Sequence, residues 1–210
     1  MEEKEVLKSN LGKDNKPNNR GKKGSKIAII VIVGFVLLVA AFIFVGNSLT
    51  NFEFKGTGYS VVNEGELKFY KAQIPMISDG VHVADYNLYL HEDPRTLENI
   101  PLSNPEIVVT QNIVVATDDD FNCDGDGIIA LANFAKLYQT FGAKVFKNDS
   151  LQCDMYSPYT HVLFHTADET SIERPKHNCY VINVNNCEIL KASEKFMIES
   201  LANVNGYYNQ

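Results

Sequence analysis

The chain has 210 residues and a formal net charge of −7 at pH 7, and this charge is divided unevenly along the sequence. Residues 1–26 carry eight Lys/Arg and four Asp/Glu, whereas residues 52–210 carry eleven Lys/Arg and twenty-two Asp/Glu. Phosphate contacts supply most of the affinity of proteins for nucleic acid, so this acidic composition argues against nucleic acid as a partner.

The first 26 residues form a basic, polar tail. The stretch from Lys13 to Gly24 offers no apolar side chain for a core, and such a segment cannot offset the entropy lost on ordering. We therefore expect residues 1–26 to be a disordered cytoplasmic tail. Its cations are placed to contact anionic lipid headgroups beside a membrane.

Residues 27–46 form an apolar segment, and the nineteen residues from Ile27 to Val45 carry no charge. At about 1.5 Å per residue such a helix covers roughly 30 Å, close to the hydrocarbon thickness of a bilayer. This predicts a transmembrane helix and a lipid bilayer as partner. The basic residues just before it are Arg20, Lys22, Lys23 and Lys26. The positive-inside rule then places the N-terminus in the cytoplasm and residues 47–210 outside the cell.

Two alternatives involve a cleaved leader. A signal peptide needs a shorter apolar core and a small-residue cleavage site, for which Val45-Gly46-Asn47 is a weak match. Lys22-Lys23-Gly24 before a long apolar segment resembles the cleavage site of type IV pilins, which implies a pilin-like surface subunit. The glutamate that pilins place early in the apolar helix is absent here.

Residues 47–210 are long enough for one globular domain. Residue patterns predict strands at 52–62, 67–72, 81–90, 106–117, 143–146, 160–166 and 179–184, and main helices at 127–141 and 188–204. The strand, helix and strand within 107–146 predict a βαβ unit with a parallel pair. We therefore expect an α+β or α/β fold, in which one mixed sheet carries two main helices.

All four cysteines, Cys123, Cys153, Cys179 and Cys187, lie in this domain. In an oxidising compartment they predict two disulfides, with three possible connectivities. No two of them are closer than eight positions, whereas zinc ligands usually come in close pairs. We favour Cys123–Cys153, tying a helix start to a later loop, and Cys179–Cys187, closing a short loop at a strand end.

An acidic loop follows the predicted strand 106–117. Its possible calcium ligands are Asp120, Asn122, Asp124 and Asp126. Oxygen ligands at positions 1, 3 and 5 with Gly125 at position 6 resemble the start of an EF-hand or dockerin calcium loop. Position 12 should be acidic and is Leu131. The alternative is a polar turn whose carboxylates favour the start of the following helix through its dipole.

The remaining sequence assigns no catalytic residue. His161 and His165 share one face of a predicted strand, but they lie about 13 Å apart, too far for one metal ion. Gly-x-Ser-x-Gly, phosphate-binding Gly loops and His-Glu-x-x-His are all absent from the sequence. Asn148 begins an N-glycosylation sequon with Asp149 and Ser150, so it is a candidate glycosylation site outside the cell.

Two stretches carry a family resemblance. One is Tyr89-Leu90-His91-Glu92-Asp93-Pro94-Arg95-Thr96-Leu97 with Ile100-Pro101, and the other is Asn178-Cys179-Tyr180-Val181-Ile182 with Glu194-Lys195-Phe196. Together they resemble uncharacterised archaeal single-pass membrane-anchored proteins. The resemblance implies the same topology and an archaeal origin, and it adds no catalytic residue and no cofactor.

These patterns lead to an expected function and two alternatives. The expected function is a non-enzymatic, membrane-anchored outer domain that binds an unknown protein partner or belongs to an envelope assembly. One alternative is an anchored extracellular enzyme, metal-assisted through the acidic loop. The other is the pilin-like surface subunit.

Overall fold

The structure is a computed structural model, and it describes residues 20–78, 81–117, 121, 123–148, 153 and 157–208. The chain divides into two compact units, Met1–Asn47 and Ser48–Gln210. Most of the predicted tail, residues 1–19, lies outside the described residues. Within the described residues the chain forms two β-sheets and three α-helices, which is a mixed α+β fold.

The first helix, α1, spans Arg20–Thr50 and contains the apolar segment. From Ile29 to Ile43, each side chain is apolar and exposed. In the part of the chain that the structure describes, no helix combines the length and the apolar character that a membrane crossing requires.

The second unit begins with an antiparallel sheet, sheet A, in the strand order β1-β2-β3-β4. Its strands are β1 (Asn51–Phe54), β2 (Thr57–Glu64), β3 (Leu67–Ser78) and β4 (Val81–Leu90). The strand predicted at 52–62 is divided by a turn, in which Lys55 and Gly56 have positive φ angles of 50° and 73°. Along β3 the alternate residues Tyr70, Ala72 and Ile74 are buried, as the two-residue period of a strand requires.

The second sheet, sheet B, has the strand order β6-β5-β7-β9-β8. Its strands are β5 (Asn112–Thr117), β6 (Lys144–Lys147), β7 (Thr160–Thr166), β8 (Ser171–Lys176) and β9 (Cys179–Val184). The pairs β5–β6, β5–β7 and β7–β9 are parallel, and β8 runs antiparallel to β9. The predicted βαβ unit is confirmed, because α2 (Asp126–Thr140) connects the parallel strands β5 and β6.

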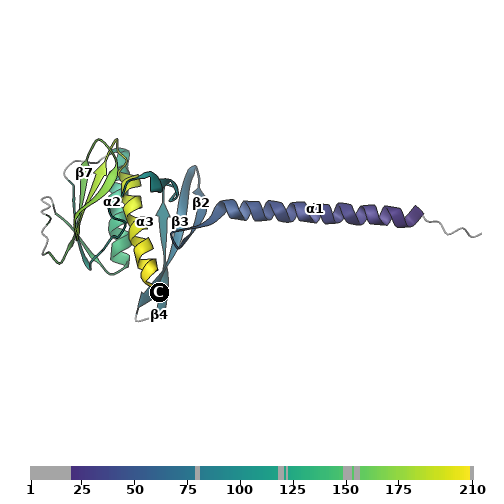
Figure 1. Ribbon diagram of the computed structural model, residues 1–210, viewed down its shortest axis with the longest axis horizontal. Helices are drawn as coiled ribbons and strands as arrows, with labels where there is room; N and C mark the ends of the chain where they lie inside the picture. Colours follow the sequence, from purple (N-terminus) through teal and green to yellow (C-terminus); the bar gives the residue numbers. More distant parts are fainter. Residues whose placement is uncertain are drawn as a thin grey trace, which may run out of the picture. The chain divides into compact units, whose positions relative to one another are not determined.

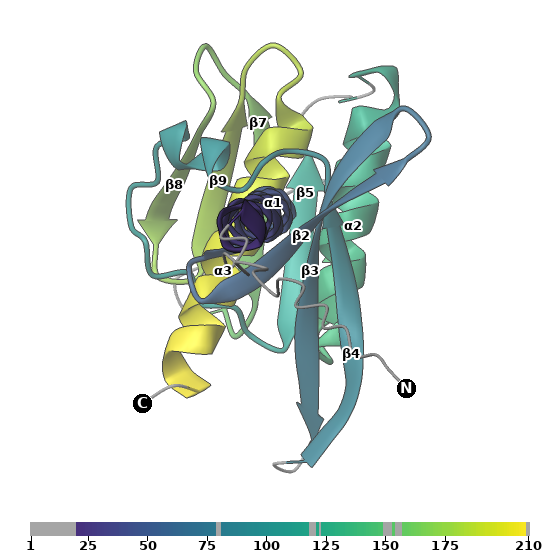
Figure 2. The same ribbon diagram turned by 90° about the vertical axis from the view of Figure 1, so that its right-hand side faces the viewer.

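The helices of the second unit form a layer between the two sheets. Figures 1 and 2 show α2 and α3 (Ile189–Tyr208), with sheet A on one side and the strands of sheet B on the other. Every residue of α3 from Ala192 to Leu201 is buried, because both broad faces of the helix are covered. The prediction of one mixed sheet was therefore wrong: the meander of β1–β4 pairs locally, and α3 separates it from sheet B.

The strand predicted at 106–117 is shorter in the structure, since β5 begins at Asn112. The backbone N–H groups of Val108 and Thr110 donate to side chains and not to a neighbouring strand. The N–H of Val108 donates to Tyr180 Oη at 2.7 Å, and that of Thr110 donates to Thr160 Oγ1 at 2.9 Å. Residues 106–111 therefore form a fixed wall at the amino end of β5, outside the sheet.

Candidate functional site

The carboxyl ends of β5, β7 and β9 meet at one edge of sheet B, because these strands are parallel. The chain leaves β5 for β6 on one side, and later returns to β7 on the other. This arrangement makes the end of β5 a topological switch point, where open α/β sheets commonly bind ligands. The acidic loop follows β5, although its residues 118–120 and 122 lie outside the described residues.

A tight turn joins this loop to α2. Cys123, Asp124 and Gly125 have positive φ angles of 39°, 56° and 101°. A Cβ atom at Gly127 would lie 1.6 Å from the carbonyl oxygen of Phe121, so glycine is required where the loop passes the helix. Asp126 lies in the first turn of α2, where the helix dipole favours a negative charge.

The predicted calcium ligands are described only in part. Asp120 and Asn122 lie outside the described residues, while Asp124 is exposed and Asp126 is half-buried. Among the residues that the structure describes, no group of three or more His, Cys, Asp or Glu side chains is placed to hold a metal ion. The calcium site stays a prediction.

The four cysteines form two disulfides, as predicted, but the favoured pairing was wrong. The bonds are Cys123–Cys187 and Cys153–Cys179, with Cα–Cα distances of 5.5 Å and 5.7 Å. Cys179 begins β9, whereas Cys187 follows the end of this strand. A six-residue strand is about 20 Å long, well beyond the reach of about 7 Å of a disulfide. The two bonds therefore lie at opposite ends of the parallel strands of sheet B. Cys153–Cys179 lies at their amino ends, and Cys123–Cys187 lies at their carboxyl ends.

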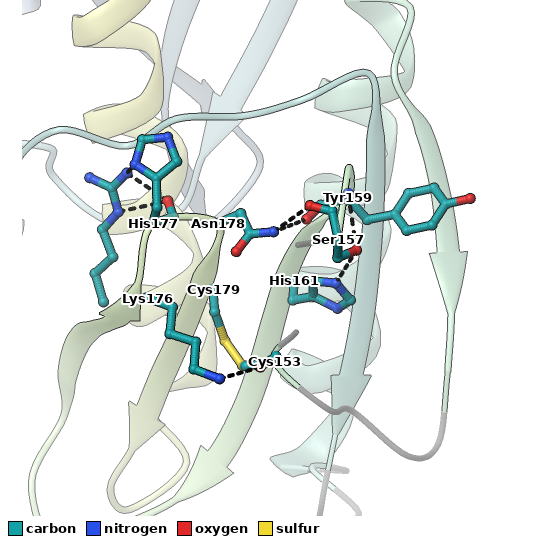
Figure 3. Close-up of a disulfide and its surroundings, with 9 residues drawn as sticks. Cys153, Ser157, Tyr159, His161, Lys176, His177, Asn178 and Cys179 are labelled. Carbon is teal, nitrogen blue, oxygen red and sulfur yellow. Dashed lines mark hydrogen bonds between the residues drawn. A yellow bond between two sulfur atoms is a disulfide. The ribbon is translucent and has the colours of Figure 1, made fainter. Parts of the chain in front are cut away.

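Figure 3 shows the surroundings of Cys153–Cys179 at the amino edge of sheet B. Lys176 Nζ donates to the Cys153 carbonyl oxygen at 2.6 Å. Asn178 Nδ2 donates to the carbonyl oxygen of Ser157 at 2.7 Å, and His161 Nε2 lies 2.8 Å from Ser157 Oγ. His161 is thus a buried residue that fastens the segment before β7.

Polar side chains on α3 make a second cluster. Glu194 is buried and accepts hydrogen bonds from the backbone N–H of His91 at 2.8 Å and that of Glu92 at 3.0 Å. Its Oε1 also lies 3.2 Å from Nδ1 of His91. These contacts hold the end of β4 on α3.

Directly after Glu194 on α3, Lys195 forms a buried ion pair of 2.6 Å with Glu199, which lies about one turn further along the helix. Glu199 also pairs with Lys55, which lies in the turn between β1 and β2. Lys55 Nζ in turn lies 2.7 Å from a carboxylate oxygen of Glu98, in the short helix η1 (Thr96–Asn99). Buried charges are stable only when they are paired in this way. The network therefore fastens sheet A and η1 to α3.

The pKa values of Glu194 and His91 follow from burial and hydrogen bonding. Burial raises the pKa of the Glu194 carboxyl, and the bonds that it accepts from His91 and Glu92 offset part of this rise. The hydrogen bond to Glu194 raises the pKa of His91. The Coulombic attraction of Asp126 and Glu92 raises it further. At the end of β4 the fold thus holds a proton more tightly than the unfolded chain does.

A cavity of about 610 Å³ lies at the other end of α3. Its walls are residues 106–111, the end of α2 with Phe141 and Ala143, and residues 200–203 of α3. Asn203 Nδ2 donates to the carbonyl oxygens of Pro105 and Ile107, at 3.2 Å and 3.3 Å, and so attaches the first wall to α3. The sequence did not predict this cavity, since the β-branched residues 106–111 indicated a strand.

The predicted glycosylation site is described at Asn148, while Asp149 and Ser150 lie outside the described residues. Asn148 is exposed just after β6, and its backbone N–H donates to the Val115 carbonyl oxygen at 2.9 Å. Glycosylation stays a prediction.

No family model matches the chain, and no curated protein or solved structure does. The resemblance to archaeal membrane-anchored proteins stays a prediction.

Proposed function

We propose that the protein is a membrane-anchored binding domain displayed on the outer side of the cell membrane. The observation that carries this proposal is the pair of disulfides, which together use all four cysteines of the chain. Such bonds persist in oxidising compartments, and both lie in the part of the chain that follows the apolar segment. This favours an extracytoplasmic location for residues 47–210.

The anchor in this proposal is the apolar segment 27–46. The exposed apolar side chains of α1, from Ile29 to Ile43, would be costly in water, and a lipid bilayer would cover them. The basic residues that precede the segment favour a cytoplasmic N-terminus. These observations support an N-terminus inside and a C-terminal domain outside.

The buried polar side chains of α3 favour binding over catalysis, because they hold the elements of the fold together. The side chains of Glu194, Lys195 and Glu199 are the obvious acid–base candidates of α3. Glu194 and Glu199 pair with residues at the end of β4 and in the turn between β1 and β2, and Lys195 pairs with Glu199 and lies 4.0 Å from Glu98 in η1. The functional surface of such a fold is then its cavity and its loops.

Labelling of lysines on intact cells tests the topology. A membrane-impermeant amine reagent should modify the exposed Lys68, Lys144 and Lys147 and leave Lys22 and Lys23 unmodified. In lysed cells all five should react, which controls for intrinsic reactivity. Modification of Lys22 or Lys23 in intact cells at the same rate as Lys68 would contradict the proposed orientation.

A further inference from the structure

The cavity beside residues 106–111 has the size and lining of a small-molecule site. Its volume of about 610 Å³ falls within the range of roughly 300–1,000 Å³ that is typical of ligand pockets. Most of its surface is apolar and comes from side chains such as Ile107, Val109, Leu201 and Ala202. A folded partner or a second copy of the chain would not fit such a volume.

The cavity is formed in advance of binding. The hydroxyls of Tyr180 and Thr160 hold the backbone of residues 106–111, and Asn203 attaches the same segment to α3. A ligand would therefore not have to order this wall, which saves the entropy that limits affinity elsewhere.

Two hydroxyls among the lining residues, those of Tyr138 and Ser200, together specify one kind of hydrogen bond. Ser200 Oγ donates its hydrogen to the Met197 carbonyl oxygen at 2.8 Å. The contact of 2.7 Å between Tyr138 Oη and Ser200 Oγ then uses the hydrogen of Tyr138. What Tyr138 Oη still offers is a lone pair, so this pair of hydroxyls accepts a hydrogen bond and does not donate one.

The charge of the lining limits the ligand further. Among the described residues that line the cavity there is no Lys, Arg or His, and Glu106 is its acid. An anionic headgroup would find no cation here. The cavity therefore suits a neutral molecule.

We propose that this cavity binds a neutral, mostly apolar molecule with one hydroxyl group, which donates a hydrogen bond to Tyr138 Oη. The inference rests on the binding function proposed above and names a ligand class for it. The same apolar body without the donor, as a methyl ether, should bind about threefold to tenfold more weakly, the usual value of one hydrogen bond.

Photolabelling of the full-length protein in lipid vesicles tests the proposal. The probe is an aliphatic alcohol that carries a diazirine, and the labelled peptides are identified by mass spectrometry. We expect labelling of residues 106–111 and 200–203 that an unlabelled alcohol of the same chain length displaces. Probe dissolved in the bilayer would label residues 27–46 without saturation, which provides an internal reference.

Two variants locate the site. Ala202→Trp should fill the cavity and abolish the displaceable labelling, whereas Ala84→Trp, at an exposed position of β4, should leave it unchanged. Tyr138→Phe removes the acceptor, while Ser200 keeps its bond to Met197. This variant should lose the preference for the alcohol over the ether, and Tyr159→Phe should keep it. Since Tyr138→Phe adds no bulk, it decides the matter even if Ala202→Trp fails to fold.

The inference would be overturned by labelling of 106–111 that an unlabelled alcohol does not displace, or by an unchanged alcohol preference in Tyr138→Phe. Either result, together with the expected lysine pattern on intact cells, would contradict the proposed ligand class without contradicting the proposed membrane topology.

Discussion

Glu194 accepts hydrogen bonds from the backbone N–H of His91 at 2.8 Å and from its ring Nδ1 at 3.2 Å. These residues are 103 positions apart, and their contact joins the end of β4 to the first half of α3. Sheet A is thus attached to α3 in part by a buried carboxylate. From a sequence pattern alone, an apolar residue would be expected at such a buried position of a helix.

Removal of this carboxylate should weaken the fold. In Glu194→Ala, the half-buried N–H groups of His91 and Glu92 lose their acceptor, so we expect the free energy of unfolding to fall by roughly 2–4 kcal/mol. Glu194→Gln keeps an acceptor oxygen and should lose about half as much. All ten tyrosines follow residue 47 and the chain has no tryptophan, so urea unfolding followed by tyrosine fluorescence reports the second unit alone.

The matched control is Glu66→Ala, because Glu66 is exposed in the turn between β2 and β3. Its cost should stay within about 0.5 kcal/mol. Equal costs for Glu194→Ala and Glu66→Ala would mean that the buried carboxylate does not fasten β4 to α3.

The same pair should make stability depend on pH. In the folded state the pKa of His91 is raised above its ordinary value of 6.5, mainly by its hydrogen bond to Glu194. The contribution of His91 is therefore complete below about pH 6.5 and is lost as pH rises through the folded pKa. The raised pKa of Glu194 acts in the same direction, from its ordinary value of 4.5 upward.

His91→Asn isolates the histidine part of this effect. An asparagine amide can donate to Glu194 in place of Nδ1 but does not titrate. Urea midpoints measured between about pH 6 and 8 should decline more steeply for the natural protein than for His91→Asn. Parallel declines would show that His91 binds its proton equally well in the folded and unfolded chains.

The sequence predicted the elements whose pattern is local. The apolar stripe of α2, the β-branched run of β5 and the short strand after them indicated the parallel βαβ unit that the structure contains. It missed β8, since Ile172 is the one buried side chain among the polar residues of that strand. It predicted a helix at 188–204 but not the burial of both of its broad faces, because Glu194 and Glu199 resemble a solvent-exposed face until their partners in sheet A are known.

Gly127 should tolerate no side chain. Because an alanine Cβ would lie 1.6 Å from the Phe121 carbonyl oxygen, the loop before α2 would have to move. We expect Gly127→Ala to lower the free energy of unfolding by roughly 1–3 kcal/mol. Gly58→Ala, in β2, meets no atom within 4 Å and should be neutral or slightly stabilising. A neutral Gly127→Ala in the same urea assay would mean that the loop is not held against the helix.

The disulfide connectivity could not be predicted from the spacing of the cysteines in the sequence. Cys179 and Cys187 are eight positions apart, and their separation in space depends on β9 lying between them as a strand. Digestion without reduction should yield a peptide with Cys123 linked to Cys187 and another with Cys153 linked to Cys179. Trypsin alone leaves Cys179 and Cys187 on one peptide, so chymotrypsin must also cut after Tyr180.

Paired serine substitutions should then show which edge of sheet B depends more on its bond. The Cys123–Cys187 bond closes a sequence separation of 64 residues, and Cys153–Cys179 closes one of 26. Loop-closure entropy predicts losses of roughly 4 kcal/mol for Cys123→Ser with Cys187→Ser, and roughly 3.5 kcal/mol for Cys153→Ser with Cys179→Ser. The longer loop encloses the shorter one, so each bond removes less entropy from the unfolded chain while the other bond is intact. Removal of both bonds should therefore cost more than the sum of the two single losses. A strictly additive loss in urea unfolding would contradict this nested arrangement, as would a peptide that links Cys123 to Cys153.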